Sequence, residues 1–199
     1  MDFRALKIEA KEALIGNRLM FLLVILVAGV LASVVPPLAF IVSPILMMGV
    51  FVVGKQILKE KKVAFEPIFT YFRDLEHALK IFVVNLLVGL IVMVGLILFI
   101  IPGIIFALRY SQAVLIISEN KDMDIMDALK ESRRMMQGYK MNFFIFNLSF
   151  IGHFLLGFIT LGIYLLYALP YIQLSMYNYY LNLKEVKGSS SKPMDAELA

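Results

Sequence analysis

The sequence contains no cysteine and no tryptophan, and it has little charge. Without cysteine the chain of 199 residues can form no disulfide, no thiolate nucleophile and no Cys-ligated metal site. Charged residues make up 17% of it and hydrophobic residues 61%, whereas soluble domains have roughly 25% and 45 to 50%. Mean hydropathy is +0.85. The composition predicts an integral membrane protein without a separate soluble domain.

Signatures of catalysis and of metal binding are also missing. The sequence has no H-E-x-x-H, no G-x-S-x-G and no glycine-rich phosphate loop. Its two histidines, His77 and His153, lie far apart in the chain, and a metal site would need carboxylates that the apolar segments lack. We therefore expect a non-enzymatic protein without cofactor or metal. The net charge of +4 does not indicate a nucleic-acid partner, because in a membrane protein the placement of positive residues matters more than their sum.

Long apolar stretches predict an all-α, polytopic membrane protein with six transmembrane helices arranged as three hairpins. A spanning helix needs about 20 mostly apolar residues. The expected spans are approximately 18–35, 38–58, 75–101, 103–118, 141–160 and 162–183. We expect residues 1–183 to form a single transmembrane helical bundle, and residues 184–199 to form a flexible cytoplasmic tail.

The distribution of charge predicts the orientation. The joints "VVPPL", "IIPGI" and "ITLGI" are short and uncharged, and they predict hairpin apices near Pro36, Pro102 and Leu161. Every Lys and Arg except Arg109 lies within the segments 1–18, 55–80, 119–140 and 184–199. Because cytoplasmic loops carry the excess of Lys and Arg, we expect both termini in the cytoplasm of a multi-pass plasma-membrane protein.

An amphipathic segment precedes each predicted hairpin. Helical spacing predicts one apolar face in the first segment, made of Phe3, Leu6, Ala10, Ala13 and Leu14. A second apolar stripe is predicted in the third segment, made of Ile125, Met126, Leu129 and Met136. Each segment is interpreted as a helix lying in the cytoplasmic interface, where membrane lipids or a protein partner could bind.

The third segment also carries helix-end signals. Asp122, Asp124 and Asp127 crowd its start, basic residues crowd its end, and Gly138 suits a left-handed C-terminal cap. The middle segment, "FEPIFTYFRDLEHALK", is weaker, with Pro67 near its first turn. The chain can thus be read as three related units, each about 60 residues long. The alternative is that any helical-hairpin protein with basic cytoplasmic loops produces the same rhythm.

Arg109 is the one basic residue inside the apolar regions, and no Asp or Glu lies in the interior of a predicted span. A charged residue at the centre of a spanning helix costs about 3 kcal/mol on insertion scales, so it is a functional candidate. Six residues beyond Pro102-Gly103, it would lie roughly 9 Å inside the outer boundary. Its side chain could snorkel to the headgroups. Alternatively, it binds an anion in the first turns of a helix, where the dipole favours negative charge.

Other polar residues could share a pocket with Arg109. His153 is predicted at a similar depth, eight residues before Leu161, although a lone intramembrane histidine commonly bonds to a neighbouring helix instead. The predicted anion- or lipid-binding site consists of Arg109, Tyr110, Gln112, His153 and Gln173.

Residues in the C-terminal half resemble an uncharacterised bacterial integral-membrane family, domain of unknown function 975. The resemblance rests on Glu131-Ser132 with Met136 and Gly138, then Ser149-Phe150-Ile151-Gly152, then Pro170-Tyr171 and the Tyr-rich end. The "IIPGII" hairpin with Arg109-Tyr110 and the Gly16-Asn17 turn are also similar. The chain departs from the pattern at His153, where a tryptophan is expected. The resemblance implies six spans in a bacterial plasma membrane and no established activity.

Two functions remain open at this stage. The first is a membrane protein that binds lipid or a protein partner, which the charged amphipathic segments favour. The second is a small transporter or channel for an anionic or amphipathic solute, with Arg109 as its binding residue. A conducting path needs polar lining along its length, and the sequence supplies only one polar patch.

Overall fold

The computed structural model describes residues 2–33 and 36–189, and these residues form helices and turns without a β-strand. The elements follow one another as α1 (Phe3–Ala13), α2 (Arg18–Ser33), α3 (Pro36–Glu60), the 3-10 helix η1 (Glu66–Arg73), α4 (Leu75–Leu98), α5 (Ile100–Tyr110), α6 (Ala113–Glu119), α7 (Ile125–Met135), α8 (Lys140–Leu148), α9 (Ile151–Ile159) and α10 (Ile163–Ser189). The all-α prediction is confirmed for this part of the chain. The first predicted apex includes residues 34–35, which lie outside it.

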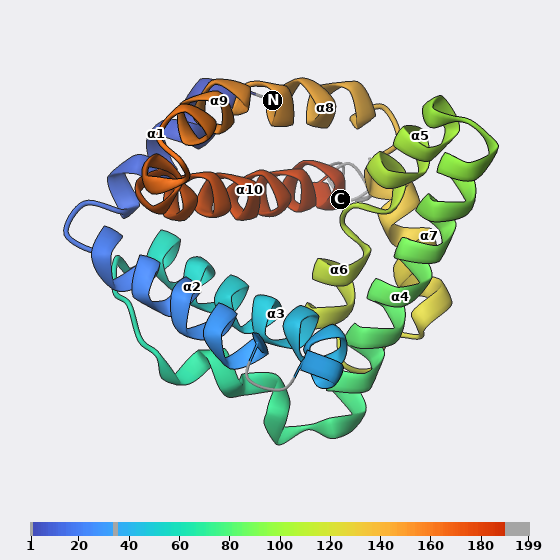
Figure 1. The fold of residues 1–199 in the computed structure, drawn as a ribbon. Coiled ribbons are helices and arrows are strands. Elements are labelled where there is room, and N and C mark those ends of the chain that lie inside the picture. Colours follow the sequence, from blue (N-terminus) through green and yellow to red (C-terminus); the bar gives the residue numbers. More distant parts are fainter. Residues whose placement is uncertain (1, 34–35, 190–199) are drawn as a thin grey trace, which may run out of the picture.

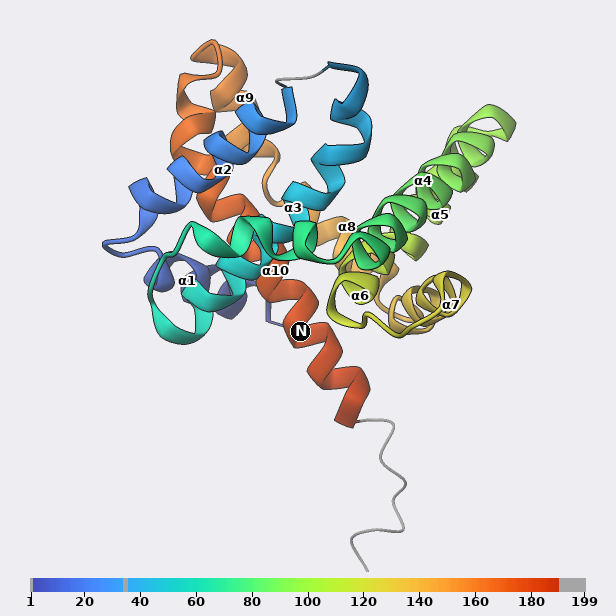
Figure 2. The same ribbon diagram turned by 90° about the horizontal axis from the view of Figure 1, so that it is seen from below.

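The helices form a ring that α10 crosses (Figure 1). Helices α2 and α3 lie along one side of α10, α8 and α9 along the other, and α4 and α5 close the ring. In the view turned by 90°, the α4–α5 and α9–α10 turns point to the same side as the outer ends of α2 and α3 (Figure 2). The C-terminal end of α10 points the opposite way. The helices therefore diverge from one end of the molecule.

Within the described residues, four helical stretches are long and apolar enough to cross a membrane: Ala39–Glu60, Leu75–Leu98, Ile100–Glu119 and Lys140–Ile159. The pair α1 and α2 is a fifth candidate, although it is bent by 93°. Helix α10 has 27 residues, and its tyrosines and amides make it less apolar than the four. Four of the six predicted spans are thus supported by length and composition.

Two predicted spans contain a break. The segment 103–118 is divided at Ser111-Gln112 between α5 and α6, and the segment 141–160 is divided at Ser149-Phe150 between α8 and α9. The start of the expected tail is helical instead, because α10 continues past residue 183 to Ser189. The remaining tail residues, 190–199, lie outside the described part of the chain.

The turn between α4 and α5 is at Phe99, three residues before the predicted apex at Pro102. Phe99 has extended backbone angles, and Pro102 lies inside the first turn of α5, where its missing N–H costs no hydrogen bond. Gly103 allows α5 to pack closely against α4, because a Cβ at this position would lie 2.8 Å from the Leu96 backbone nitrogen. The Pro-Gly pair therefore starts a helix and lets it approach α4.

The turn at Leu161 agrees with the prediction. Leu161 and Gly162 have φ of 51° and 89°, and the N–H of Gly162 donates to the carbonyl of Gly157 at 2.7 Å. This bond is typical of a helix that ends in the left-handed conformation, for which glycine is best suited.

Two of the amphipathic segments form the expected helices, but their apolar faces are covered by protein. Leu6, Ala10 and Ala13 of α1 are buried, and α1 packs against α10. In α7, Leu129 and Met136 are buried as expected, whereas Met126 is 55% exposed because the buried face is centred on Ala128, Ser132 and Met135. These faces are therefore not available for insertion into lipid.

Backbone hydrogen bonds repeat between the first and third units. After α1, four N–H groups donate in the pattern Leu14 to Ala10, Ile15 to Glu12, Asn17 to Leu14 and Phe21 to Asn17. After α7 the same pattern joins Met136 to Ser132, Gln137 to Arg134, Tyr139 to Met136 and Phe143 to Tyr139. Gly16 and Gly138 have φ of 77° and 85° at equivalent places. The middle unit keeps the last two bonds, from Asp74 to Tyr71 and from Ala78 to Asp74. This shared turn supports the interpretation as three related units.

The contact between α4 and α5 can be tested at Gly95. A Cβ at this position would lie 2.9 Å from the Gly103 Cα and 2.7 Å from Phe106 Cδ2, so we expect Gly95→Ala to lower the free energy of unfolding by about 1–3 kcal/mol. Gly89, on the same helix, has no atom within 4 Å of the corresponding position. Gly89→Ala should be neutral or stabilising, because alanine favours helix. Thermal unfolding in detergent compares the two, and equal melting temperatures would contradict the close contact.

Candidate functional site

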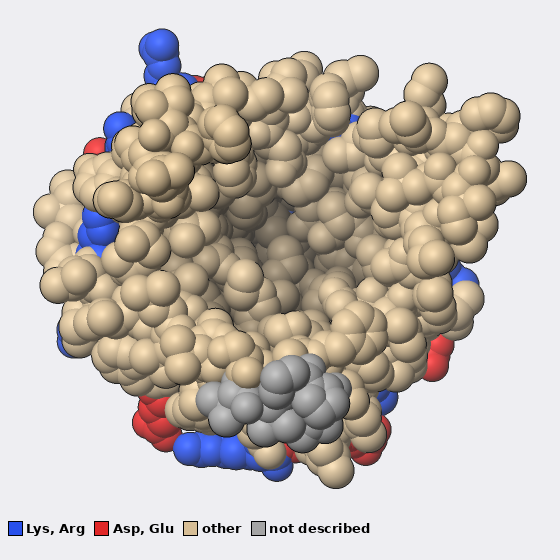
Figure 3. Space-filling model, viewed as in Figure 1, with Lys and Arg blue, Asp and Glu red and all other residues tan. Residues whose placement is uncertain are grey.

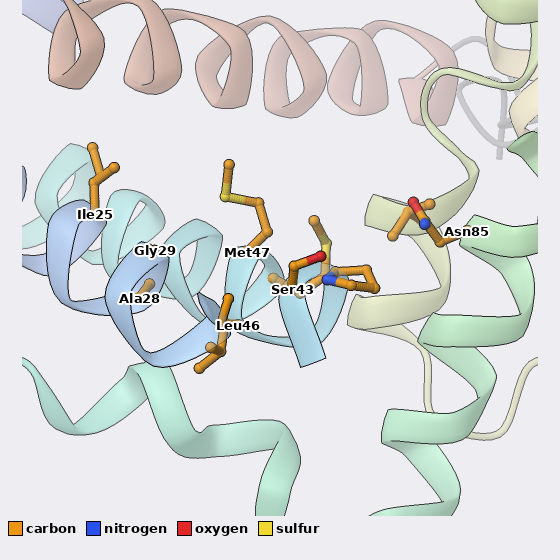
Figure 4. Close-up of a pocket in the computed structure, with 11 residues that line it drawn as sticks. Ile25, Ala28, Gly29, Ser43, Leu46, Met47 and Asn85 are labelled. Atoms are coloured by element: carbon orange, nitrogen blue, oxygen red, sulfur yellow. The ribbon is translucent and has the colours of Figure 1, made fainter. Parts of the chain in front are cut away.

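An apolar cavity of about 400 Å³ lies between α2, α3, α4 and α6. Its lining is made of Ile25, Ala28, Gly29, Ala32, Ser43, Pro44, Leu46, Met47, Met48, Asn85 and Val114. In Figure 4, Ile25 and Met47 point toward α10, and the amide of Asn85 points from α4 toward α3. Ser43 and Asn85 are the polar side chains of this lining. The mostly apolar lining is thus suited to an apolar chain.

Small residues and a proline keep this space open. Ala28, Gly29 and Ala32 place little side-chain volume along one side of α2, and nothing lies within 4 Å of a Cβ built on Gly29. Pro44 lies inside α3, so the carbonyl four residues earlier receives no helical hydrogen bond. The spacing of these residues was visible in the sequence, but the four helices that bring them together were not.

One face of the molecule has a central hollow, and this face is apolar. In the space-filling view, Lys, Arg, Asp and Glu appear at the margins, and the walls of the depression consist of other residues (Figure 3). Large apolar side chains are exposed at the turns between helices, with Leu161 94% and Phe99 74% exposed. An apolar surface of this extent is typical of contact with a membrane or a partner.

The charged end of the molecule is organised by Glu119 at the end of α6. Its side chain is only 8% exposed, and it forms ion pairs with Lys55 of α3 and Lys184 of α10. The hydroxyl of Tyr180 donates to the same carboxylate at 3.0 Å. We name Lys55, Glu119, Tyr180 and Lys184 the Glu119 junction. It joins one helix from each of the three units.

Neighbouring contacts hold α6 in position for this junction. Tyr71 of η1 donates to the carbonyl of Ser118 at 3.0 Å, and the His77 ring donates to the carbonyl of Ile117 at 2.8 Å. Burial raises the pKa of Tyr71, so the hydroxyl stays protonated and remains a donor. The sequence placed these segments on the cytoplasmic side but did not predict their mutual contacts, because nothing in the local pattern pairs residues about 40 positions apart.

Arg109 lies in the last turn of α5, not in the first turns of a helix. The expectation that Arg109 binds an anion with help from the N-terminal dipole of its helix is therefore wrong. At the C-terminal end of a helix, the dipole favours the cation itself. Its Nε is buried without a hydrogen-bond partner among the described residues. Ser132 of α7 bridges the break beside it, donating to the Arg109 carbonyl at 3.1 Å and accepting from the Gln112 N–H at 3.3 Å.

The other predicted site residues lie among different partners. Gln112 is buried at the α5–α6 break, where its amide donates to Ser111 Oγ, and Tyr110 packs at the end of α5. His153 lies among aromatic rings, with the Tyr171 centroid 5.6 Å from its own. The Gln173 amide of α10 is 3.1 Å from the Tyr177 hydroxyl and 3.2 Å from Met47 Sδ. Among the contacts of the described residues, none joins His153 or Gln173 to Arg109.

Residues 90–187 match a family described as "Protein of unknown function (DUF975)". Through these residues, the chain belongs to that family. The match confirms the resemblance found in the sequence, and it includes the α4–α5 turn, Arg109, Glu119 and α7 to α10. Gly16 and Asn17 precede the matched range. No curated protein and no solved structure matches the chain.

The Glu119 junction makes a prediction about stability. Glu119→Gln leaves Lys55 and Lys184 without their carboxylate, and both ammonium groups are partly exposed, at 33% and 51%. Because water can solvate them in part, we expect a loss of about 1–2 kcal/mol in the free energy of unfolding. Lys130→Gln breaks the exposed pair with Asp127, and it should leave the free energy of unfolding nearly unchanged because water solvates both groups. Denaturation in mixed micelles measures both, and equal losses would show that the junction is not special.

Proposed function

We propose that this chain is a non-enzymatic integral membrane protein of the bacterial plasma membrane that binds phospholipid. An acyl chain would occupy the cavity between α2, α3, α4 and α6. The observation that carries the proposal is the apolar lining of this cavity, within an apolar hollow on the face that carries the exposed turns. Ser43 and Asn85 can donate hydrogen bonds to the ester region of a lipid.

The proposal includes the finer topology expected from the sequence. In addition to the four helical stretches described above, α2 and α10 would cross the membrane and make six spans, with both termini in the cytoplasm. The Glu119 junction and the ion pair between Asp74 and Lys121 support this sidedness, because charged groups gather at one end of the helices. The hydrogen bond from Lys121 holds the pKa of Asp74 below its usual range, so this pair stays ionised near neutral pH.

Sidedness can be measured directly, since the natural chain has no cysteine. We expect a thiol introduced by Lys62→Cys to react with a membrane-impermeant maleimide only after the cells are opened. A thiol from Phe99→Cys should react in intact cells or stay unreactive in lipid. The unsubstituted chain gives the zero level. Labelling of Lys62→Cys in intact cells would reverse the proposed orientation.

Lipid binding in the cavity is tested by filling it. Gly29→Leu places an isobutyl group among the lining residues, so we expect the number of phospholipids retained after purification in mild detergent to fall severalfold in native mass spectrometry. The matched control is Gly89→Leu, at another exposed helical glycine with nothing within 4 Å of its Cβ position and outside the cavity lining. Equal lipid retention in both variants would exclude this cavity as the binding site.

Transport of an anionic or amphipathic solute is the second candidate, and it makes a different prediction. Lining by two polar side chains does not favour passage of a polar solute. A flux of anions through proteoliposomes that depends on Arg109, with no lipid retained by the purified protein, would favour transport over the proposed function.

A further inference from the structure

A groove between α1 and α10 contains basic and aromatic side chains outside the predicted site. One part of it, about 550 Å³, is lined by Lys11, Glu12, Arg18 and Tyr167 together with apolar residues of α1 and the following turn. A second part, about 310 Å³, is lined by Arg4, Lys7, Lys11 and Tyr171 with Phe3 and Ile8. The two parts share Ile8 and Lys11, so they are neighbours along α1. Together they contain four cations and one carboxylate.

Two of these cations face tyrosine rings of α10. The Arg18 guanidinium carbon is 4.0 Å from the centroid of the Tyr167 ring, and Lys11 Nζ is 5.8 Å from that of Tyr171. A ring attracts a cation but does not neutralise it. Arg18 Nε is buried and has no hydrogen-bond partner, and neither Arg18 nor Lys11 forms an ion pair among the described residues. Glu12 lines the same part of the groove but is not paired with either cation, so the two cations outnumber it and have no ion-pair partner among the described residues.

Lys7 is in a different situation. Its Nζ donates to Ser149 Oγ at the break between α8 and α9, and it lies 4.2 Å from the centroid of the Phe150 ring. Protein covers part of the Lys7 side chain, and this burial lowers the pKa of Lys7. Lys7 thus supports the fold and adds positive potential, while Lys11 and Arg18 remain for a ligand.

Apolar surface continues from the basic groove. Ile15 and Leu19 are exposed beside it, and so are Leu166 and the flank of Tyr167. Along α2, Ile25 and Gly29 follow Arg18 at seven and eleven residues, so a helix of 3.6 residues per turn places all three on one face. Ile25 and Gly29 line the apolar cavity. The eleven residues from Arg18 to Gly29, at 1.5 Å each, give about 16 Å, roughly half the thickness of the hydrocarbon core.

We propose that Arg18 and Lys11 bind the phosphate of an anionic phospholipid whose acyl chain runs along α2 into the apolar cavity. The inference rests on the proposed function and names its ligand class. A guanidinium and an ammonium supply charge-assisted hydrogen bonds to phosphate oxygens, and Tyr167 keeps the guanidinium in place. A free phosphate ion could use the same cations but would gain nothing from the apolar face.

The test measures binding of short-chain phosphatidylglycerol, phosphatidylcholine and inorganic phosphate to the detergent-solubilised full chain by native mass spectrometry. We expect a preference for phosphatidylglycerol, and we expect Arg18→Gln and Lys11→Gln each to weaken its binding by about tenfold, which is 1.4 kcal/mol. The matched control is Arg133→Gln. Arg133 is an exposed cation in the last turn of α7, and it occupies the place in the third unit that Lys11 occupies in the first. The affinity of this variant for phosphatidylglycerol should be unchanged.

Each other outcome has a defined meaning. Equal binding of both lipids by the unsubstituted chain would overturn the headgroup site and leave lipid binding in the cavity intact. Retention of no lipid at all would remove the proposed function itself. Binding of inorganic phosphate as tight as that of the lipid would identify a free-anion site instead and overturn the inference. If Arg18→Gln does not fold, Lys11→Gln decides, because Lys11 is an exposed residue of α1.

Discussion

The ion pairs of Glu119 are the constraint on which the rest of the architecture depends. A carboxylate with 8% of its side chain exposed needs compensation, and two lysines and one tyrosine hydroxyl supply it. Because Lys55, Glu119 and Lys184 come from three units, the junction holds α3, α6 and α10 together at one end. Toward the other end the helices diverge (Figure 2). This arrangement creates the hollow, since helices joined at one end and separated at the other leave space between them.

Local patterns in the sequence were sufficient to predict most of the helices but not the contacts between them. The face of α1, the caps at Gly138 and Leu161 and most helix bounds follow from spacing and turn chemistry, which act within a few residues. The turn at Phe99 was placed three residues late, because Pro102 suits the first turn of a helix as well as a joint. The breaks at Ser111 and Ser149 give no signal of this kind, since neither a proline nor a glycine marks them.

Errors in the predicted site have one physical origin. Arg109 attracted attention because a lone charge in an apolar segment is costly, and the cost is real wherever the segment lies in lipid. The sequence could not show that Arg109 lies in the last turn of a helix. It also could not show that the hydroxyl of Ser132 in α7 donates a hydrogen bond to the Arg109 carbonyl. The residues that surround free space come from α2, α3, α4 and α6, and the basic groove combines α1 with α10. Such combinations depend on tertiary packing, for which a single sequence without related sequences gives no information.

The apolar hollow has a consequence for stability in different surroundings. In water, side chains such as Phe99 and Leu161 would each remain solvated at a cost set by their apolar area, and the diverging helices could lower that cost only by closing together. In a bilayer this driving force vanishes, because lipid chains are as apolar as the side chains they contact. If acyl chains fill the hollow, as the proposed function requires, they would stabilise the open arrangement. Bound lipid would then be a structural part of the protein as well as its ligand, and the Glu119 junction would fix the space that the lipid occupies.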